Sequence, residues 1–206
     1  MNKLTHMAFV FIASIFMTVL AHAVEVGPTP VKAGDSLAGE FTQKRYLVGF
    51  PAPLLTTGEF FVVPEKGLVW KISKPFESRL IITDTGITQI SHGSVTTVDG
   101  SSGFAATINN IMGPALRGDW ARLEDKFDVQ FAPATATDPW QVTLKPTDAL
   151  IVKVISKVTL HGKVKTNVID TLKPNGDRDV IYLSSQKTFT ALTEAAAQAF
   201  LFEGNK

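Results

Sequence analysis

Residues 39–75 read GEFTQKRYLVGFPAPLLTTGEFFVVPEKGLVWKISKP, and this stretch decides the fold class. Apolar and polar side chains alternate here in three runs, at residues 40–48, 57–63 and 68–73. Alternation with a period of two residues is typical of a half-buried β-strand. The segments 49–53 and 64–67 between the runs carry glycine and proline, which favour turns. The stretch therefore predicts three consecutive strands.

The pattern of short strands continues on the carboxyl-terminal side of this stretch. Further strands are expected at residues 79–83, 87–91, 94–98, 127–131, 140–145, 158–160, 164–172 and 180–183. Glycine-containing turns follow the first three of these, and Asn175-Gly176 supplies a hairpin turn before the last. Such short strands with regular turns predict a mainly β protein built as an antiparallel meander. A long sheet of this kind must close, curl or be covered.

Helical spacing interrupts the strands after Ser102. One apolar stripe with this spacing predicts an uncharged amphipathic helix, and it comprises Phe104, Ile108, Ile111, Met112 and Ala115. Gly113-Pro114 would break or kink this helix. From the residues alone, ordinary packing of the helix against the sheet is a better interpretation than a mobile lid.

Three shorter segments also have helical character. Residues 35–38 are expected to form a helical turn before the first strand. Residues 148–155 fit either a strand, because of their β-branched side chains, or one to two helical turns, which we favour. Thr193 is expected to cap a helix over residues 194–201, which Phe200 and Leu201 would dock to the rest of the protein.

Residues 1–23 have the features of a cleavable signal peptide. Lys3 supplies the positive charge, residues 7–20 form an uncharged apolar run, and Ala21-His22-Ala23 fits the small-x-small rule for cleavage. The apolar run is shorter than the roughly 20 residues that a membrane-spanning helix needs. We therefore expect cleavage after Ala23, a tail over residues 24–33, and one exported domain over residues 24–206.

Composition argues against several classes of function. Without Lys3, basic and acidic residues are equal in number, whereas a nucleic-acid-binding protein would show a basic excess. The chain has no cysteine, so neither a disulfide nor a lipid-modified cysteine is expected. Beyond residue 23 the histidines are His92 and His161, each beside a glycine in an expected turn, and no metal-binding or nucleophile motif is present. We expect no catalytic residues, no metal and no cofactor.

Several short motifs resemble one protein family. They are Phe41-Thr42-Gln43-Lys44, Gly58, Trp70 with Pro75 five residues on, and SRLIITDTG at residues 78–86. Their order and spacing resemble the start of the periplasmic outer-membrane lipoprotein carriers, the Lol carrier family. The resemblance is clearest over residues 39–86 and continues by order of elements to about residue 185. It implies an antiparallel, unclosed half β-barrel, curved around an apolar cavity that binds acyl chains, with covering helices.

The resemblance changes the interpretation of the helix over residues 104–112, because a helix that covers the cavity is expected there in the family. It also brings out one departure. Lol carriers resemble each other in having an arginine just before the proline that precedes the tryptophan, and this arginine ties the lid shut. Here Val63 precedes Pro64, which puts that latch in doubt unless Lys66 takes its place.

Apolar side chains are the candidate binding residues. The strand over residues 57–63 is apolar on both faces, which indicates two apolar environments rather than one solvated face. The candidates for the cavity and its lid are Phe41, Phe60, Val62, Leu68, Trp70, Ile72, Leu80, Ile82, Phe104, Ile108, Ile111 and Met112.

The expected function is that of a non-enzymatic, monomeric periplasmic carrier for acylated cargo, either a lipoprotein or another lipid. Such a carrier would take its cargo from an inner-membrane donor protein and deliver it to an outer-membrane acceptor protein. One alternative is an envelope module that senses lipid or binds a partner protein without transport. Another alternative is a hydrolase whose site is not apparent in the sequence.

Overall fold

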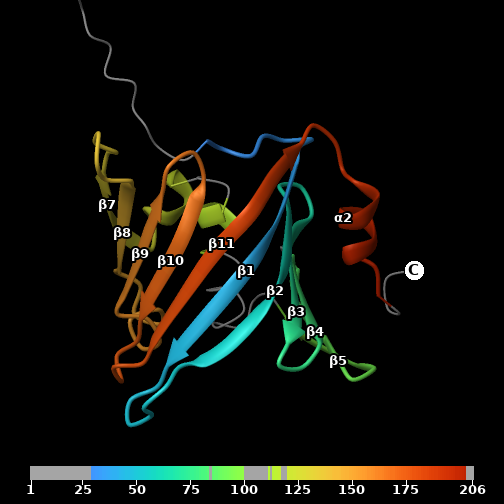
Figure 1. Ribbon diagram of the computed structural model, residues 1–206, viewed down its shortest axis with the longest axis horizontal. Helices are drawn as coiled ribbons and strands as arrows, with labels where there is room; N and C mark the ends of the chain where they lie inside the picture. Colours follow the sequence, from blue (N-terminus) through green and yellow to red (C-terminus); the bar gives the residue numbers. More distant parts are fainter. Residues whose placement is uncertain (1–28, 84, 100–110, 112, 117–119, 203–206) are drawn as a thin grey trace, which may run out of the picture.

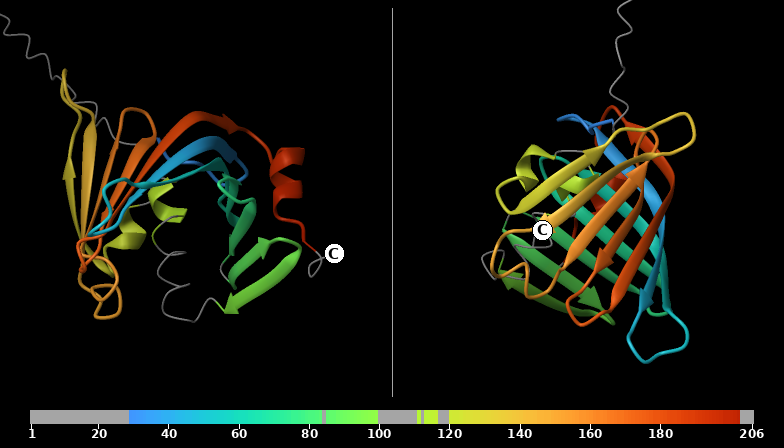
Figure 2. Two further views of the ribbon diagram at one scale, coloured as in Figure 1. Left: turned by 60° about the horizontal axis from the view of Figure 1, so that its bottom comes forward. Right: turned by 90° about the vertical axis from the view of Figure 1, so that its left-hand side faces the viewer.

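The computed structural model describes residues 29–83, 85–99, 111, 113–116 and 120–202. These residues form a single eleven-stranded sheet in which every neighbouring pair is antiparallel. The strand order is β6-β5-β4-β3-β2-β1-β11-β10-β9-β8-β7, so β6 and β7 are free edges and the sheet does not close. The sheet curves into an open arch (Figures 1 and 2). The predicted mainly β, unclosed half-barrel is confirmed.

The strands agree closely with the alternating runs of the sequence. They are β1 (Ser36–Tyr46), β2 (Leu54–Val63), β3 (Gly67–Lys74), β4 (Ser78–Thr83), β5 (Gly86–Ser91), β6 (Ser94–Asp99), β7 (Phe127–Ala132), β8 (Trp140–Pro146), β9 (Lys157–Gly162), β10 (Thr166–Leu172) and β11 (Arg178–Phe189). The helices with described bounds are the 3-10 turn η1 (Ala121–Leu123) and α2 (Glu194–Ala199), while Ile111 and residues 113–116 are also helical.

The first and last strands pair with each other at the centre of the sheet. β1 and β11 are in register from Ser36 opposite Phe189 to Tyr46 opposite Arg178, with one irregularity between Ala38 and Glu40. These are the two longest strands, with 11 and 12 residues. This pairing joins an amino-terminal half of the arch, β1 to β6, to a carboxyl-terminal half, β7 to β11.

The two faces of the arch carry separate apolar clusters, as the pattern of β2 predicts. Phe60 and Val62 belong to the large inner cluster, on the concave side. Phe61 and Val63 belong to a small outer cluster, which α2 completes from the convex side with Ala196, Ala199 and Phe200 (Figure 2). Both faces of β2 are therefore apolar because each face is covered by a different element.

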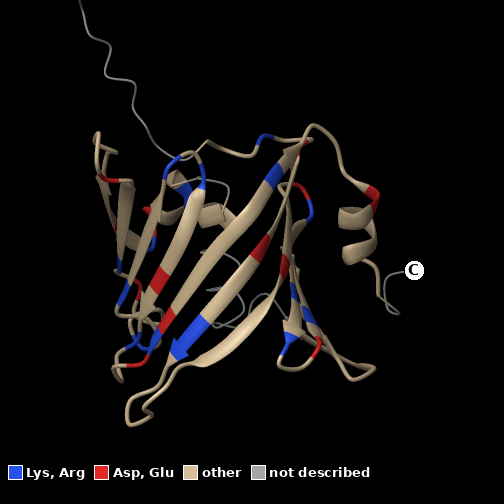
Figure 3. Cartoon of the chain, in the orientation of Figure 1, with Lys and Arg blue, Asp and Glu red and all other residues tan. Residues whose placement is uncertain are grey.

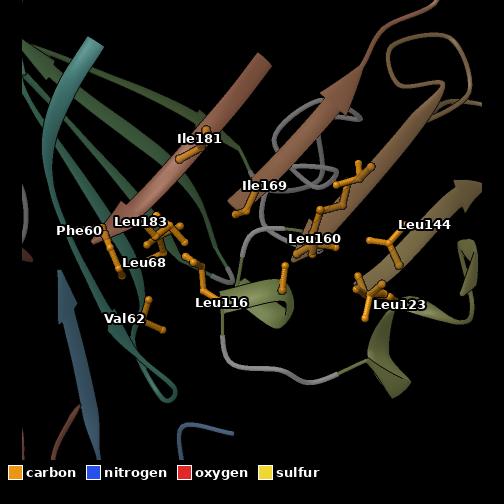
Figure 4. Close-up of a cluster of buried hydrophobic side chains, with 14 of the residues drawn as sticks. Phe60, Val62, Leu68, Leu116, Leu123, Leu144, Leu160, Ile169, Ile181 and Leu183 are labelled. Atoms are coloured by element: carbon orange, nitrogen blue, oxygen red, sulfur yellow. The ribbon is translucent and has the colours of Figure 1, made fainter. Parts of the chain in front are cut away.

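The inner cluster runs along the whole arch. It draws apolar side chains from β1 to β5 and from β7 to β11, and it also includes Ile111, Ala115, Leu116 and Leu123. In Figure 4, Leu116 lies between side chains of β2 and β3 and those of β8 and β9. The Thr166 hydroxyl donates a hydrogen bond of 3.0 Å to the carbonyl oxygen of Ala115 and so attaches the helical residues 113–116 to β10. These helical residues lie inside the arch (Figure 2).

Two expectations for the amino-terminal region are wrong. Residues 36–38 are not helical but begin β1, because residues 187–189 of β11 extend far enough to pair with them. This last strand is longer than the expected run over residues 180–183. The expected tail also contributes to the core: Val31 is buried, and the amide of Thr29 donates a 2.7 Å hydrogen bond to the carbonyl of Val164.

Other expectations for the chain have mixed outcomes. Residues 148–155 form helical turns, in which the amide of Ile155 donates to the carbonyl of Ile151 at 2.8 Å, so the alternative of a strand is wrong. The Thr193 hydroxyl accepts from the amide of Ala196 and caps α2, as predicted. Phe200 is buried against the sheet, whereas the Leu201 side chain is 52% exposed and Leu201 contacts the sheet through its carbonyl oxygen, which accepts a 2.8 Å hydrogen bond from Arg79 of β4. The expected signal peptide, and residues 104–110 and 112 of the expected amphipathic helix, lie outside the described residues.

Candidate functional site

An apolar cavity of about 270 Å³ lies on the inner side of the arch. Side chains from both halves of the sheet form its wall, and Ile111 contributes from the helical segment inside the arch. Its apolar lining consists of Leu68, Trp70, Leu80, Ile82, Ile111, Val154, Ile155, Val158, Ile169 and Ile181. Cavities that hold small ligands are typically concave and mainly apolar, with few polar groups, as this one is.

The strand register explains why these residues converge. Trp70 of β3 pairs with Leu80 of β4, and Leu68 pairs with Ile82, so alternate residues of both strands share the inner face. On the other half, Ile169 of β10 pairs directly with Ile181 of β11. The curvature of the sheet then brings the inner faces of these two strand pairs opposite each other across the arch (Figure 2).

Trp70 is held in place by two aromatic neighbours. Its ring stacks on Phe41 with centroids 4.0 Å apart and on Phe60 with centroids 5.8 Å apart. Offset stacking of this kind adds about 0.5–1.5 kcal/mol per pair beyond area burial. The indole is therefore a rigid part of the wall and only 6% exposed.

The candidates named from the sequence divide into three groups. Five of them line the cavity: Leu68, Trp70, Leu80, Ile82 and Ile111. Four others do not line it: Phe41, Phe60 and Val62 are buried in the inner cluster, and Ile72 packs at its edge. The last three, Phe104, Ile108 and Met112, lie outside the described residues.

One end of the cavity is polar, and its residues were not among the candidates. Gln43, Arg45, Thr171, Lys173 and Asp179 line this end. Asp179 is at its centre: its Oδ1 accepts from Arg45 Nε at 2.7 Å and from Gln43 Nε2 at 3.2 Å, while Lys173 Nζ lies 3.0 Å from Oδ2. Figure 3 shows charged residues near the carboxyl-terminal end of β1 and the amino-terminal end of β11, which lie side by side.

Burial and charge act in opposite directions on Asp179. Burial by itself would raise the pKa of this carboxyl group, since it disfavours the charged form. The hydrogen bonds from Arg45 and Lys173, together with their positive charges, outweigh burial and lower the pKa from its usual value. Asp179 is therefore a carboxylate at neutral pH, and the two cations beside it leave this end of the cavity with a net positive charge.

A second, more open hollow of about 750 Å³ lies at the turns between β3 and β4 and between β5 and β6. Its lining is more polar and includes Lys71, Glu77 and Arg79, and Ile72 is part of it. Phe76 and His92 face each other across these turns with ring centroids 6.5 Å apart. This hollow lacks the mainly apolar wall of the first cavity.

Val63, which stands where Lol carriers have the latch arginine, points away from the cavity. Val63 is buried in the outer cluster beside Val69 and Ile81. In the turn that follows, Glu65 Oε1 accepts a 2.6 Å hydrogen bond from the amide of Gly34, which ties this turn to the amino-terminal segment. A latch from residue 63 is therefore not part of this protein, and the substitution by Lys66 stays a prediction.

The family model described as "Outer membrane lipoprotein carrier protein LolA-like" matches residues 31–204. The chain belongs to this LolA-like family. The description names a carrier of outer membrane lipoproteins. No curated protein matches the chain.

Solved structures show more distant likeness. A LolA superfamily protein from Nitrosomonas europaea is 12% identical with a TM-score of 0.46, over 82% of this chain and 91% of that one. The MucA/MucB complex of Pseudomonas aeruginosa is 15% identical with a TM-score of 0.43, over 82% of this chain and 56% of that one. A putative outer membrane lipoprotein-sorting protein domain from Vibrio parahaemolyticus is 10% identical with a TM-score of 0.40, over 79% of this chain and 88% of that one.

The described residues carry two further findings. Within them, no helix is long and apolar enough to cross a membrane. In the same part of the chain, no group of three or more histidine, aspartate or glutamate side chains is placed to hold a metal ion. The cavity itself is apolar with one polar end, which suits binding of an amphiphile.

Proposed function

We propose that this protein is a periplasmic carrier that binds an acyl chain in the cavity inside the arch and moves the acylated molecule between the inner and outer membranes. The observation that supports the proposal most strongly is the apolar cavity inside the arch, whose wall comes from both halves of the sheet. The LolA-like family description supports the same class of function. Export through the signal peptide expected over residues 1–23 would bring the protein into the space between the two membranes.

The energetics of acyl binding favour a cavity of this kind. Each methylene removed from water contributes about 0.8 kcal/mol. An acyl chain that buries about ten methylenes therefore gains about 8 kcal/mol, from which the costs of association and of ordering the chain are subtracted. The wall is built largely of strands within the sheet, so little of the protein has to be ordered when the chain enters.

Lipid transfer between vesicles tests the proposal. Donor vesicles carry a fluorescent phospholipid together with a quencher, and acceptor vesicles carry neither. We expect transfer to accelerate in proportion to the concentration of the purified protein. Saturable acyl binding without acceleration of transfer would instead support a lipid-sensing or protein-binding module, and absence of both would contradict the carrier and the sensor alike.

A pair of threonine variants makes this test specific for the cavity. Thr171 lines the cavity from β10, and Thr171→Trp would fill part of it with an indole. Thr159 lies on β9 opposite Asp170, so its side chain points to the other face of the sheet, and Thr159→Trp is the matched control. We expect Thr171→Trp to slow transfer several-fold and Thr159→Trp to leave it unchanged.

The expected cleavage site of the signal peptide can be measured directly. Amino-terminal sequencing of the protein recovered from the periplasm should begin at Val24, because the small-x-small rule places cleavage after Ala23. Recovery of an intact Met1 end in the membrane fraction would contradict export by cleavage.

A further inference from the structure

The polar end of the cavity has more positive than negative charge. Arg45 and Lys173 each carry one positive charge, and Asp179 between them carries one negative charge. In the adjoining turn, Asp177 does not line the cavity: its Oδ1 accepts from the amide of Val48 at 3.0 Å and its Oδ2 from the amide group of Asn175, while its charge lies near enough to Lys173 and Asp179 to interact with both. The groups that line the cavity itself therefore keep an excess of one positive charge.

The two cations are placed on the solvent side of this cluster. The side chains of Arg45 and Lys173 are 45% and 30% exposed, whereas that of Asp179 is 11% exposed. The carboxylate thus lies deeper and orients the cations from behind. A guanidinium group has five N–H donors and an ammonium group has three. Among the described residues, the Arg45 side chain makes one hydrogen bond, from Nε to Asp179. Most of its N–H donors can therefore reach a ligand.

These donors adjoin the apolar wall directly. On β11, Asp179 is followed two residues later by Ile181 on the same face, and on β10 Ile169 precedes Thr171 in the same way. A ligand whose chain lies against Ile169 and Ile181 would therefore have its head beside Arg45 and Lys173. An apolar chain with an anionic head fits this arrangement in both parts.

We infer that Arg45 and Lys173 form a headgroup site, held in place by Asp179 and Gln43, that selects amphiphiles with an anionic carboxylate or phosphate head. The inference rests on the proposed function and narrows it. The preferred cargo would be a fatty acid or a lipid with a phosphate head, rather than an acylated molecule whose lipid end is uncharged. Asp179 and Gln43 are positioning residues in this site, since the ligand would contact the cations.

Competition among ligands with one acyl chain and different heads tests the inference. Tetradecanoate, monotetradecyl phosphate and neutral monomyristoylglycerol are each used to displace a fluorescent acyl probe from the purified protein. We expect at least one of the two anionic ligands to bind about tenfold more tightly than monomyristoylglycerol, a difference that corresponds to about 1.4 kcal/mol. The advantage should shrink as salt is added, because the cations are partly exposed.

The two anionic ligands distinguish the possible sources of the head. Preference for tetradecanoate would assign a carboxylate site and a fatty acid cargo. Preference for monotetradecyl phosphate would assign a phosphate site and a phospholipid-like cargo. Equal binding of all three ligands would overturn the headgroup site while leaving the proposed carrier function intact, whereas no saturable binding of any ligand would overturn both.

Substitutions identify the groups responsible. We expect Arg45→Gln and Lys173→Gln each to weaken the binding of the anionic ligands several-fold, toward the affinity of monomyristoylglycerol. The affinity of each variant for monomyristoylglycerol itself should stay within about twofold of the wild-type value. Lys173→Arg should keep the preference, because it retains the charge. Lys44→Gln is the matched control: Lys44 follows Gln43 on β1 but faces outward, with its Nζ 5.5 Å from the centre of the Tyr182 ring.

The outcomes of the variants are decisive in both directions. Loss of anionic preference in Arg45→Gln or Lys173→Gln, together with its retention in Lys44→Gln, would establish the site. Retention of the preference in both Arg45→Gln and Lys173→Gln, or an equal loss in Lys44→Gln, would overturn it. Thermal unfolding of each variant, measured without ligand, separates a purely structural role of the ion pairs from a role in binding.

Discussion

At the scale of single residues, Gly58, within the stretch 39–75, shows why the fold requires a glycine at one position. It lies on β2 opposite Phe41 of β1, next to an irregularity in the pairing with β3. A β-carbon at this position would overlap the carbonyl oxygen of Lys71 and approach Phe41 Cε1 to 2.8 Å. Because Phe41 stacks on Trp70, the absence of a side chain at Gly58 is part of what allows this aromatic pair to form.

Substitution of Gly58 by alanine should therefore be costly. We expect Gly58→Ala to lower the free energy of unfolding by about 2–4 kcal/mol, since the obstacle is backbone and cannot move aside easily. Gly93→Ala is the control: Gly93 has a φ of +75° but open space around its Cα, so about 1 kcal/mol is expected. Urea denaturation of both variants measures the difference, and equal losses would contradict this account of the packing.

Asp179 contributes a pH-dependent part of the stability. Its pKa is lower in the folded protein than the ordinary value of 3.8, through Arg45 and Lys173, despite its burial. A lowered pKa means that the carboxylate stabilises the fold above pH 3.8 and that this contribution is lost as the pH falls below 3.8 toward the folded-state pKa. The free energy of unfolding of the wild-type protein should therefore fall as the pH drops below 3.8.

Asp179→Asn isolates this contribution. The variant should be less stable than wild type at neutral pH, and the gap should narrow as the pH falls below 3.8, because the wild-type carboxylate becomes protonated while the amide does not titrate. Denaturation midpoints measured across the acidic range provide the comparison. A gap of constant size down to the lowest pH would show that folding does not lower the pKa of Asp179 and would contradict this account.

At the scale of elements, β2 separates two apolar clusters that serve different purposes. Its inner face contributes to the wall region around the cavity, and its outer face supports α2. Helix α2 has only six residues, so on its own it would be unstable, and packing on the sheet must hold it. Phe200, directly after the helix, is 7% exposed and is the largest side chain that it brings to the outer cluster.

A substitution in the outer cluster should affect stability and not binding. We expect Phe200→Ala to cost about 3 kcal/mol of stability, as large-to-small changes at buried aromatic positions do. The affinity for an acyl probe should stay the same, because the sheet lies between Phe200 and the cavity. Leu201→Ala, at a position that is 52% exposed, should change stability by less than about 0.5 kcal/mol. Weaker acyl binding in folded Phe200→Ala would contradict the separation of the two clusters.

At the scale of the whole molecule, local patterns predicted the strands and half of the cavity. Strand patterning, which is a local signal, named Leu68, Trp70, Leu80 and Ile82 among the candidates, and these four line the cavity. The two apolar faces of β2 were predicted in the same way. What local patterns could not give was the pairing of β1 with β11, which brings together residues more than a hundred positions apart.

The features that the sequence did not predict all depend on this long-range pairing or on its neighbours in the sheet. The turn expected at residues 36–38 is strand because β11 extends alongside it, and tertiary contacts override local propensity there. Ile169 and Ile181 have ordinary strand patterns, and only the register of β10 and β11 assigns them to the cavity. Arg45, Lys173 and Asp179 are spread over three strands or turns, so no spacing in the sequence marks them as one cluster.

The central claim is that an acyl chain binds inside the arch, and photo-crosslinking tests it most directly. A fatty acid with a diazirine at the end of its chain is bound to the purified protein and irradiated, and the modified residues are identified by peptide mass spectrometry. We predict adducts on inward-facing residues such as Trp70, Ile169 and Ile181, and their loss when unlabelled fatty acid competes. Adducts confined to the outward-facing neighbours Lys71 and Tyr182, or to the open hollow around Phe76 and His92, would contradict the claim.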